Sequence, residues 1–593
     1  MAATPEPPDD GPSTPEPAPP EPAPPAQLDL DDFPAAGLDD WRELARAVLT
    51  KSGAADDVDP LTALARTDLD GISVAPIFLA SDDPGVAAVT RAPGAWDIRV
   101  RHDDPDPTRA NAAVLADLEG GASSLWLRIG SGAIAPRDLP RVLDGVLLDL
   151  VAVVLDAEPE VEAAVEALAG VAGEVSLRGS LGIDPVASAF RRGARSATWS
   201  VPEQRVGLAP VTVDGTAYAD AGASDADEIA FATATAVAYL REGGAVDDVE
   251  FRFAVTDRQF PSIAKLRAAR RVWARVAELC DVPGAVQRQH AVTAAAMFSA
   301  RDPWVNMLRA TVAGFAAAAG GADAVTVHPF DVAVGRPVPF ARRIARNVHA
   351  ILHDEASLAR VVDPAAGSWY VESLTDAVAQ QAWDRFTEIE RAGGIVAALG
   401  NGLVSEAVSA VASERDQQIA TRRFPLTGVS EFANLDEKPL ERDDAPSVSG
   451  LRRWSEPFEA WRDRSDHVLA ASGSRPTVQL LALGGRGKSA ARVGFATNLF
   501  QAGGLAVQVV TDAAECNGPV VCLCSTDGVY ASDGAAAAAA VRHAGATQVW
   551  LAGQGEIDGV DSRVYAGCDV LDVVQRAWDA FPQSSETNVE VTA

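Results

Sequence analysis

One candidate for a chemical role is a glycine-rich run near the C-terminal end of the sequence. The run, ALGGRGKS at 482–489, follows an apolar stretch and precedes a helix-forming one, where a phosphate-binding loop would lie. That loop requires glycine five positions before Gly487, and Ala482 stands there. An ordinary turn between a strand and a helix therefore explains the run better than a nucleotide site.

The cysteines form a second candidate group. Cys522 and Cys524 share one face of an expected strand, and Cys516 is close in sequence, so a thiolate metal site is conceivable. They lie in or beside an apolar run at 519–524, where free cysteine packs as a small hydrophobic residue. The structural role is the stronger interpretation.

Two histidines have a spacing that suits zinc. His349 and His353 are one helical turn apart, but Ala350 stands where a zinc protease would carry its glutamate base. The pair is therefore interpreted as incidental. We expect no metal-binding, cofactor-binding or catalytic residue from these three groups.

A basic segment, IAKLRAARRVW at 263–273, carries several cationic side chains at helical spacing. Taken alone, it predicts an amphipathic helix with a solvated basic face. Nothing in its local pattern makes it a binding site.

The composition of the whole chain limits its partners. The 593 residues include 50 Lys and Arg against 83 Asp and Glu, a net charge of −33, which disfavours nucleic acid and anionic membrane surfaces. The first basic residue is Arg42, whereas secretory and mitochondrial leaders need basic residues near their start. With only five cysteines as well, we expect a cytoplasmic protein.

Most of the chain alternates short β-rich runs with longer amphipathic ones, which predicts parallel strands joined by crossover helices. Nearly 400 residues of this pattern, at 37–428, favour a closed (β/α)8 TIM barrel. The expected strands are 123–129, 151–155, 174–177, 210–213, 249–255 and 324–327. The expected helices are 136–148, 161–168, 185–192, 224–240, 263–279 and 340–352.

The remaining segments are predicted as tails, a linker and a smaller domain. Residues 1–36 are proline-rich and acidic and predict a disordered tail, and 583–593 a C-terminal tail. The charged stretch 429–475 predicts a linker. Residues 476–582 predict a flavodoxin-like doubly wound domain, with strands at 478–483, 505–510, 519–524 and 547–551 and helices at 490–502 and around 535–540.

Several motifs resemble the adenosylcobalamin-dependent methylmalonyl-CoA mutase family. They are YADAGA at 218–223, the basic segment at 263–273, RDPWVNMLR at 301–309, GGAD at 320–323, RIARN at 343–347 and DPAAGSWYVESLT at 363–375. Further matches run in order from DGI at 70–72 to GCDVL at 567–571. The family architecture, a substrate barrel followed by a flavodoxin-like cobalamin domain, agrees with the division drawn from periodicity.

The cobalamin-binding loop of the family's active members is missing its ligands here. Active members hold cobalt through the histidine of an Asp-x-His-x-x-Gly loop after the first strand of the small domain. An ungapped alignment puts Gly487 at the aspartate, Ser489 at the histidine and Arg492 at the glycine. Alignment error cannot supply the histidine, because none lies between His467 and His543. The connections at 511–518 and 553–567 are also shorter than crossover helices need, which leaves the local topology open.

The substrate site of the active members is degraded in the same way. Their Ser-Gly-Tyr-His segment, whose histidine hydrogen-bonds the substrate thioester, aligns its histidine with Ala217. The Thr-Met-Tyr element that screens the radical has no counterpart, because no tyrosine precedes Tyr218. Only the residues AWDIR at 95–99 remain of the segment that follows it.

The resemblance therefore implies a non-catalytic small subunit. Its partner would be a catalytic large subunit in a heterodimer that interconverts methylmalonyl-CoA and succinyl-CoA, and adenosylcobalamin would be bound by that large subunit. The retained motifs from 301 to 375 would then determine the fold. Two alternatives stay open: a self-sufficient acyl-CoA mutase with an altered site, and a stand-alone ligand-sensing barrel.

Overall fold

The computed structural model describes residues 37–86, 88–157, 159–202, 206–445 and 450–581. Packing divides the chain into two units, Met1–Ala65 and Arg66–Ala593. The predicted tails at 1–36 and 583–593 lie outside the described residues. The other domain boundaries drawn from the sequence stay predictions.

The described part of the first unit is a pair of helices, α1 (Leu38–Lys51) and α2 (Pro60–Leu64). Carboxylates cap both of them. Asp40 accepts a hydrogen bond from the Gly37 amide at 2.7 Å, and Asp59 accepts one from the Thr62 amide at 3.2 Å.

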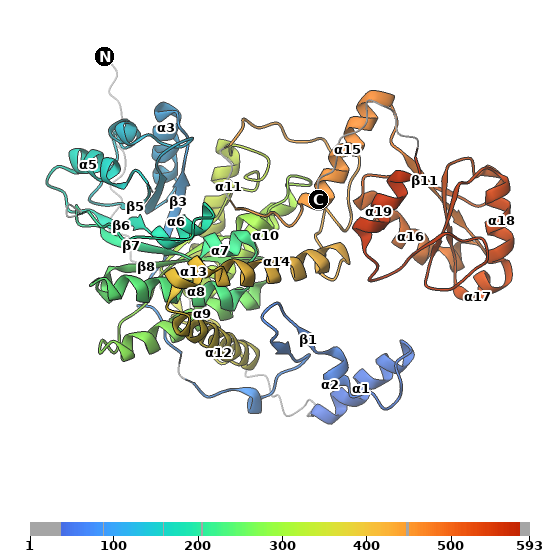
Figure 1. Ribbon diagram of the computed structural model, residues 1–593, viewed down its shortest axis with the longest axis horizontal. Coiled ribbons are helices and arrows are strands. Elements are labelled where there is room, and N and C mark those ends of the chain that lie inside the picture. The colour runs from blue at the N-terminus through green and yellow to red at the C-terminus, as the bar shows by residue number, and fades with distance from the viewer. Residues whose placement is uncertain (1–36, 87, 158, 203–205, 446–449, 582–593) are drawn as a thin grey trace, which may run out of the picture. The chain divides into compact units, whose positions relative to one another are not determined.

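A closed barrel dominates the second unit (Figure 1). Within the described residues it has eight parallel strands, which confirms the predicted TIM barrel. The strands are β3 (Asp97–His102), β4 (Ser124–Arg128), β5 (Ala152–Asp156), β6 (Arg178–Ile183), β7 (Ala209–Asp214), β8 (Val249–Val255), β9 (Arg288–Thr293) and β10 (Ala324–Thr326). β10 pairs with β3 to close the barrel, and a small hairpin, β1 (Arg66–Thr67) with β2 (Ser73–Val74), precedes it.

Helices cover the barrel because alternate residues of each strand point outward and are apolar, such as Phe251 and Phe253 on β8. The helices that follow strands are α3 (Pro107–Glu119), α4 (Leu139–Val142), α5 (Val161–Ala172), α6 (Pro185–Arg191), α7 (Thr216–Ala221), α8 (Asp225–Arg241), α9 (Gln259–Leu279), α10 (Val305–Ala319) and α11 (Pro339–Ala350). Three more follow them: α12 (Trp369–Arg391), α13 (Ile395–Asn401) and α14 (Leu403–Ala420). α12 packs against α8 and α9, outside the first helical layer.

One predicted strand and one predicted helix of the barrel are wrong. The strand expected at 174–177 is instead β6, and the helix expected at 136–148 is reduced to a 3₁₀ turn (Pro136–Asp138) and α4. Glycine hid β6 from the sequence pattern. Gly179 and Gly182 have positive φ, and a Cβ at either would lie 1.9 Å from a carbonyl oxygen of β5, so this close strand contact requires glycine.

The predicted solvated basic face of residues 263–273 is also wrong. These residues belong to α9, where Lys265, Arg267 and Arg270 are buried because α12, α8 and α10 pack around the helix. Lys265 pairs with Glu228 and, at 2.9 Å, with Asp225. Arg267 donates hydrogen bonds to the carboxylates of Asp363 and Glu372. Arg270 donates to the backbone carbonyl groups of residues 320 and 321, just after α10.

The C-terminal domain is a doubly wound parallel sheet, which confirms the predicted flavodoxin-like fold. Its elements are β11 (Thr477–Ala482), α16 (Arg486–Ala502), β12 (Ala506–Val510), β13 (Val520–Cys524), α17 (Asp527–Val529), α18 (Ala535–His543), β14 (Gln548–Ala552), β15 (Ser562–Val564) and α19 (Val570–Asp579). The strand order is β12-β11-β13-β14-β15, so the order reverses between β11 and β13. Apolar clusters line both faces of the sheet.

The short connection after β12 crosses β11 without an α-helix. Only a 3₁₀ turn (Ala513–Glu515) lies in it. The buried side chain of Gln479 on β11 holds the crossing: its Oε1 accepts hydrogen bonds from the Asn517 and Gly518 amides at 2.9 and 2.8 Å. One side-chain amide thus satisfies backbone groups that a crossover helix would satisfy internally.

The segment predicted as a linker contains a helix, α15 (Glu456–Ser472), that its charged composition did not indicate. Phe458 and Trp461 of α15 are buried in the apolar cluster beneath β11. Glu459 accepts hydrogen bonds from the Ala300 and Arg301 amides at 2.6 and 3.2 Å, in the segment that follows β9. α15 therefore packs on both folds.

A search of the described residues for membrane spans found no single helix that is long and apolar enough. The bent pair α13 and α14 meets the length and composition test jointly.

Candidate active site

The inside of the barrel is lined by polar side chains. Along each strand the residues that alternate with the outward apolar ones point to the axis, so β3 contributes Arg99, β4 Trp126 and β8 Glu250 with Arg252. The other inward polar residues are Arg101, Ser124, Arg128, Asp156, Ser180, Thr212, Asp214, His290 and Thr326. Sequence reasoning missed this set. Its signal was the alternation of polar and apolar residues along β3, β4 and β8, where a buried parallel sheet normally has continuous apolar runs.

An ion pair crosses the barrel near the amino ends of the strands. Arg99 on β3 donates two hydrogen bonds to Glu250 on β8, at 2.7 and 3.2 Å, and a third to Ser124 at 2.9 Å. Burial alone would raise the pKa of Glu250, but the Arg99 guanidinium outweighs it and lowers that pKa. The pair therefore stays charged and occupies the axis.

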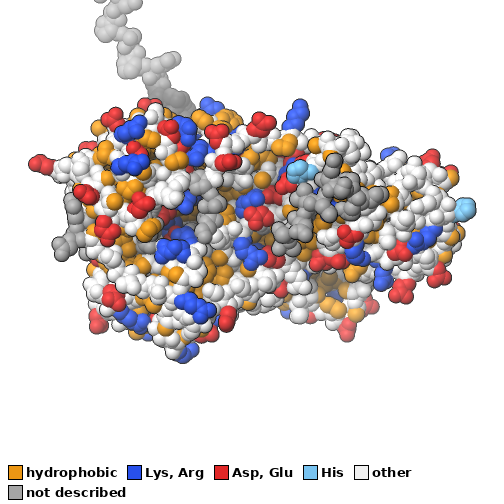
Figure 2. Space-filling model, turned by 45° about the horizontal axis from the view of Figure 1, so that its top comes forward, with side chains coloured by type: hydrophobic (Ala, Val, Ile, Leu, Met, Phe, Trp, Pro, Cys, Tyr) orange, Lys and Arg blue, Asp and Glu red, His pale blue; other side chains and the backbone are white. Residues whose placement is uncertain are grey.

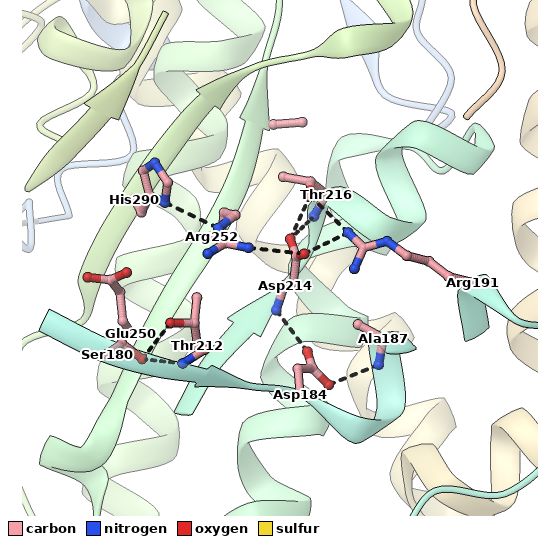
Figure 3. A network of polar contacts seen from close by, with 12 residues as sticks. Ser180, Asp184, Ala187, Arg191, Thr212, Asp214, Thr216, Glu250, Arg252 and His290 are labelled. Atoms are coloured by element: carbon pink, nitrogen blue, oxygen red, sulfur yellow. Dashed lines mark hydrogen bonds and ion pairs between the residues drawn. The ribbon is translucent and has the colours of Figure 1, made fainter. Parts of the chain in front are cut away.

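A second network lies nearer the carboxyl ends of the strands (Figure 3). Asp214 on β7 accepts hydrogen bonds from Arg191 at 2.6 Å and Arg252 at 3.2 Å, and from the Thr216 hydroxyl at 2.5 Å. Burial would raise the pKa of Asp214, but the two guanidinium groups hold it well below its usual range. Asp214 is a fixed carboxylate and cannot act as a general acid at neutral pH.

His290 continues this network from β9. Its Nδ1 accepts a hydrogen bond from Arg252 Nε at 3.2 Å, which places the ring proton on Nε2, because arginine only donates. Nε2 then donates to Thr326 at 2.8 Å. Burial, with Arg99 and Arg252 adding to it, lowers the pKa of His290 well below its usual value. The imidazole is a neutral connector with both nitrogens in use.

Aromatic stacking fills the space between these networks. The Arg252 guanidinium lies 4.1 Å from the centre of the Trp126 ring. The His290 ring is nearly perpendicular to the same indole, with the two ring centres 5.4 Å apart. Trp126 also packs with Val154 and Val292. Above this layer, at the carboxyl ends of the strands, a cavity of about 410 Å³ remains.

The groups that active mutases use on substrate have no equivalent at the aligned positions. Ala217 is buried on α7 and offers only a methyl group where the resemblance expects the thioester histidine. Tyr218 is buried between the rings of Phe190 and Phe231, so it is a core residue. His349 accepts a hydrogen bond from the indole of Trp96 at 3.2 Å, and His353 packs edge-on against that indole.

A buried carboxylate fastens the two helices beside the seam between β10 and β3. Asp117 on α3 binds Arg342 and Arg346 on α11, and its Oδ2 lies 3.4 Å from His102 Nε2. Among the described residues, the register of β10 with β3 contains two pairs, Ala324 with Asp97 and Val325 with Ile98. The Asp117 cluster therefore ties the first and last strands of the barrel through their helices.

The C-terminal domain has its candidate ligand crevice at the carboxyl ends of β11 and β13, where the strand order reverses. Tyr530 fills part of it: its hydroxyl accepts from the Ser525 amide at 2.7 Å and lies 3.0 Å from the Leu523 carbonyl and 2.9 Å from the Ala552 carbonyl. Arg492 on α16 covers this ring and donates to Ala552 at 2.8 Å.

The residues present in this crevice do not fit a histidine-ligated cobalamin. Ser489, at the aligned ligand position, is buried and donates its hydroxyl to Gly485 at 3.1 Å within its own helix. A Cβ on Gly553 would come within 2.3 Å of Arg492, which shows how closely that arginine is packed. His467 and His543 are exposed and belong to α15 and α18.

The described residues were also searched for a metal site. A search of the described residues found no group of three or more His, Cys, Asp or Glu side chains that could hold an ion. Cys516, Cys522 and Cys524 are buried free thiols in the sheet core. The glycine-rich run forms the turn from β11 to α16, with Gly484 and Gly485 at positive φ.

Comparison with known proteins gives consistent names. The family model described as methylmalonyl-CoA mutase matches residues 150–472. The "Methylmalonyl-CoA mutase small subunit" of Streptomyces virginiae is 47% identical, covering 92% of this chain and 97% of that protein. The protein of the same name from Propionibacterium freudenreichii subsp. shermanii is 35% identical over 92% of this chain and 95% of its own. The "Probable methylmalonyl-CoA mutase small subunit" of Mycobacterium tuberculosis (strain ATCC 25618 / H37Rv) is 39% identical, covering 86% and 92%.

Proposed function

The chain belongs to the methylmalonyl-CoA mutase family, and from that premise we propose that it is the non-catalytic small subunit of a heterodimeric mutase. Its partner is a catalytic large subunit that interconverts methylmalonyl-CoA and succinyl-CoA in propionyl-CoA metabolism in the cytoplasm. The small-subunit names of the relatives support this assignment.

The filled barrel axis is the observation that carries the non-catalytic role. The Arg99–Glu250 pair and the Trp126 ring occupy the barrel axis, so a ligand has no path along it unless they separate. Opening the axis would separate a buried ion pair, which costs about 3–5 kcal/mol when one partner is left uncompensated. Binding an acyl-CoA there would have to repay that cost before any chemistry.

The second part of the proposal concerns the cofactor. We place adenosylcobalamin on the large subunit, because in this chain Ser489 stands at the ligand position and Tyr530 with Arg492 fills the crevice. When bound, the cofactor would supply the radical for the 1,2-shift. This chain contributes folded surface for the heterodimer and no group to that step.

Two measurements test the proposal. Mixed with its large subunit, the chain should elute from gel filtration as a 1:1 complex at micromolar concentration. Alone, under anaerobic conditions with adenosylcobalamin and methylmalonyl-CoA, it should give no turnover and no spectrum of histidine-ligated cobalamin.

A variant sharpens the second measurement. Ser489→His should remain inactive, because Gly487 cannot orient the new imidazole as the aspartate of active members does. Turnover by the wild-type chain alone would contradict the non-catalytic role. Separate elution of the two subunits would contradict the pairing.

A further inference from the structure

Two neighbouring helices on the outside of the barrel, α10 and α11, carry exposed apolar side chains (Figure 1). Trp304 and Leu308 are 48% and 68% exposed, and Phe340 and Ile351 are 46% and 50% exposed. Leu308 lies one helical turn beyond Trp304, and Ile351 lies three turns beyond Phe340, so each pair faces one way. We call these four side chains the α10–α11 strip. Large apolar side chains that gather on one face mark an interaction surface.

The strip is continuous from one helix to the other. The rings of Trp304 and Phe340 both pack on Phe330, with ring centres 5.1 and 6.1 Å from its own. Further along, a Cβ on Gly314 of α10 would lie 3.3 Å from Val348 of α11, so the two helices stay close over several turns. The exposed side chains therefore belong to one surface.

α10 lacks the charged outer face of a solvated helix. Of its fifteen residues only Arg309 is charged, and that side chain is buried. Charged residues make up 22% of the whole chain, and a surface helix normally carries them on the side that faces water. Depletion of charge together with exposed aromatic rings is the composition of the core of a protein–protein interface.

The two ends of the strip carry opposite charges. The Arg343 guanidinium lies 5.5 Å from the centre of the Phe340 ring and forms no ion pair among the described residues. At the other end Asp354 and Glu355 are exposed, and Asp354 has the neighbouring His353 as its ion-pair partner. A complementary surface is therefore apolar, with a carboxylate at one end and a cation at the other.

A second barrel of the same family meets this description. The motif at 301–309, which contains Trp304 and Leu308, resembles that family, so a large subunit of the family is expected to have a similar strip. Two such strips that meet antiparallel bring the basic end of each against the acidic end of the other, as in a twofold interface. The proposed function names the large subunit, and not a second copy of this chain, as the partner.

We propose that the α10–α11 strip is the surface on which the large subunit docks, with Trp304 and Leu308 at its centre and Arg343 opposite a carboxylate of the partner. The Trp304 ring already stacks on Phe330, so its exposed face is oriented before binding and loses little side-chain freedom.

This inference rests on the proposed function and assigns the pairing to particular residues. Isothermal titration of the full chain with the purified large subunit tests it. Leu308→Glu should weaken the affinity at least tenfold, because it puts an unpaired carboxylate into an apolar contact. The matched control is Leu147→Glu: this leucine is 65% exposed and lies between α4 and β5, whereas the strip follows β9 and β10. The control should keep the wild-type affinity.

Two further variants report on the contact itself. Arg343→Glu should weaken pairing about threefold or more at low salt and less at high salt, because salt screens a rim charge, whereas Arg343→Lys should pair almost normally. Thr311→Cys places a thiol on the exposed side of α10, one turn beyond Leu308. The large subunit should protect this thiol from a maleimide, while the exposed native Cys280 keeps its reactivity.

The outcomes separate this inference from the proposed function. Wild-type pairing by Leu308→Glu, equal weakening by Leu147→Glu, or full labelling of the introduced thiol in the complex would overturn the docking surface and leave the pairing intact. A wild-type chain that does not pair at all would overturn both. A wild-type chain that self-associates, and a Leu308→Glu chain that does not, would show that a second copy covers the strip. Circular dichroism checks the fold, and Arg343→Glu decides if Leu308→Glu does not fold.

Discussion

Replacing Asp117 with asparagine should open the seam of the barrel. The Asp117 carboxylate is 1% exposed and is shared by Arg342 and Arg346, whose side chains are 15% and 13% exposed. The substitution would keep the side-chain volume and remove the charge, which leaves two nearly buried cations without their counter-ion. Breaking a buried pair in this way costs about 3–5 kcal/mol. Because the two arginines are partly exposed, we expect the free energy of unfolding to fall by about 3 kcal/mol, the lower end of that range.

Urea unfolding followed by tryptophan fluorescence measures this loss. With a slope of about 3 kcal/mol per molar urea, the midpoint should fall by about 1 M. Hydrogen exchange of the β3 and β10 amides should accelerate more than that of β5 and β6, because the seam joins β3 to β10. The control is Glu278→Gln, whose side chain is 54% exposed and pairs with Arg275, itself 57% exposed, and which should cost less than about 1 kcal/mol. Equal midpoints for the two variants would refute the reasoning.

Three further changes should affect stability in measurable ways. Tyr530→Phe should destabilise the C-terminal domain by about 1–3 kcal/mol, because it leaves the Ser525 amide without its acceptor and removes the one proton that the hydroxyl donates to the Leu523 or the Ala552 carbonyl; urea unfolding checks this, and an unchanged midpoint would contradict the role of the hydroxyl. Burial lowers the pKa of His328 and of His349 to about 4. In the unfolded chain these histidines already bind protons below about pH 6.5, so lowering the pH favours unfolding. The free energy of unfolding should therefore drop by about 1.4 kcal/mol per pH unit for each histidine between about pH 6.5 and 4. Unfolding at pH 7 and 5 measures the slope, which His349→Gln should reduce. Glu459→Gln should speed hydrogen exchange of the Ala300 and Arg301 amides, whereas exchange at the wild-type rate would show that the Glu459 charge is not needed there.

The sequence predicted most of the architecture because outward-facing strand positions and helices follow simple periodicities. The strand predicted at 249–255 has the bounds of β8, and helix α8 begins and ends within one residue of its prediction. β6 was missed because Gly179 and Gly182 carry no side chain that could reveal the strand pattern. α15 was missed because its charged residues form contacts that only the folded chain brings together.

Figure 2 shows basic side chains (blue) and acidic ones (red) interspersed over one face of the molecule, whereas the polar residues of the candidate site are buried in the barrel and were harder to predict. The missing histidines could be read directly from the sequence at Ala217 and Ser489. What replaces them could not, because Arg99 finds Glu250 only after the barrel closes, 151 residues later in the chain. The basic residues of α9 show the same limit: a local pattern predicts a solvated face, and α12, about a hundred residues further on, covers it.

The ion pair across the barrel also has a kinetic consequence. Arg99 and Glu250 lie on strands that are far apart in sequence, so their contact forms only after a long loop has closed. A partly closed barrel would hold either charge in a dry interior without its partner, a species with a high free energy. Barrel closure should therefore be a late and concerted event, and this chain should refold more slowly than a barrel of equal size with an apolar interior.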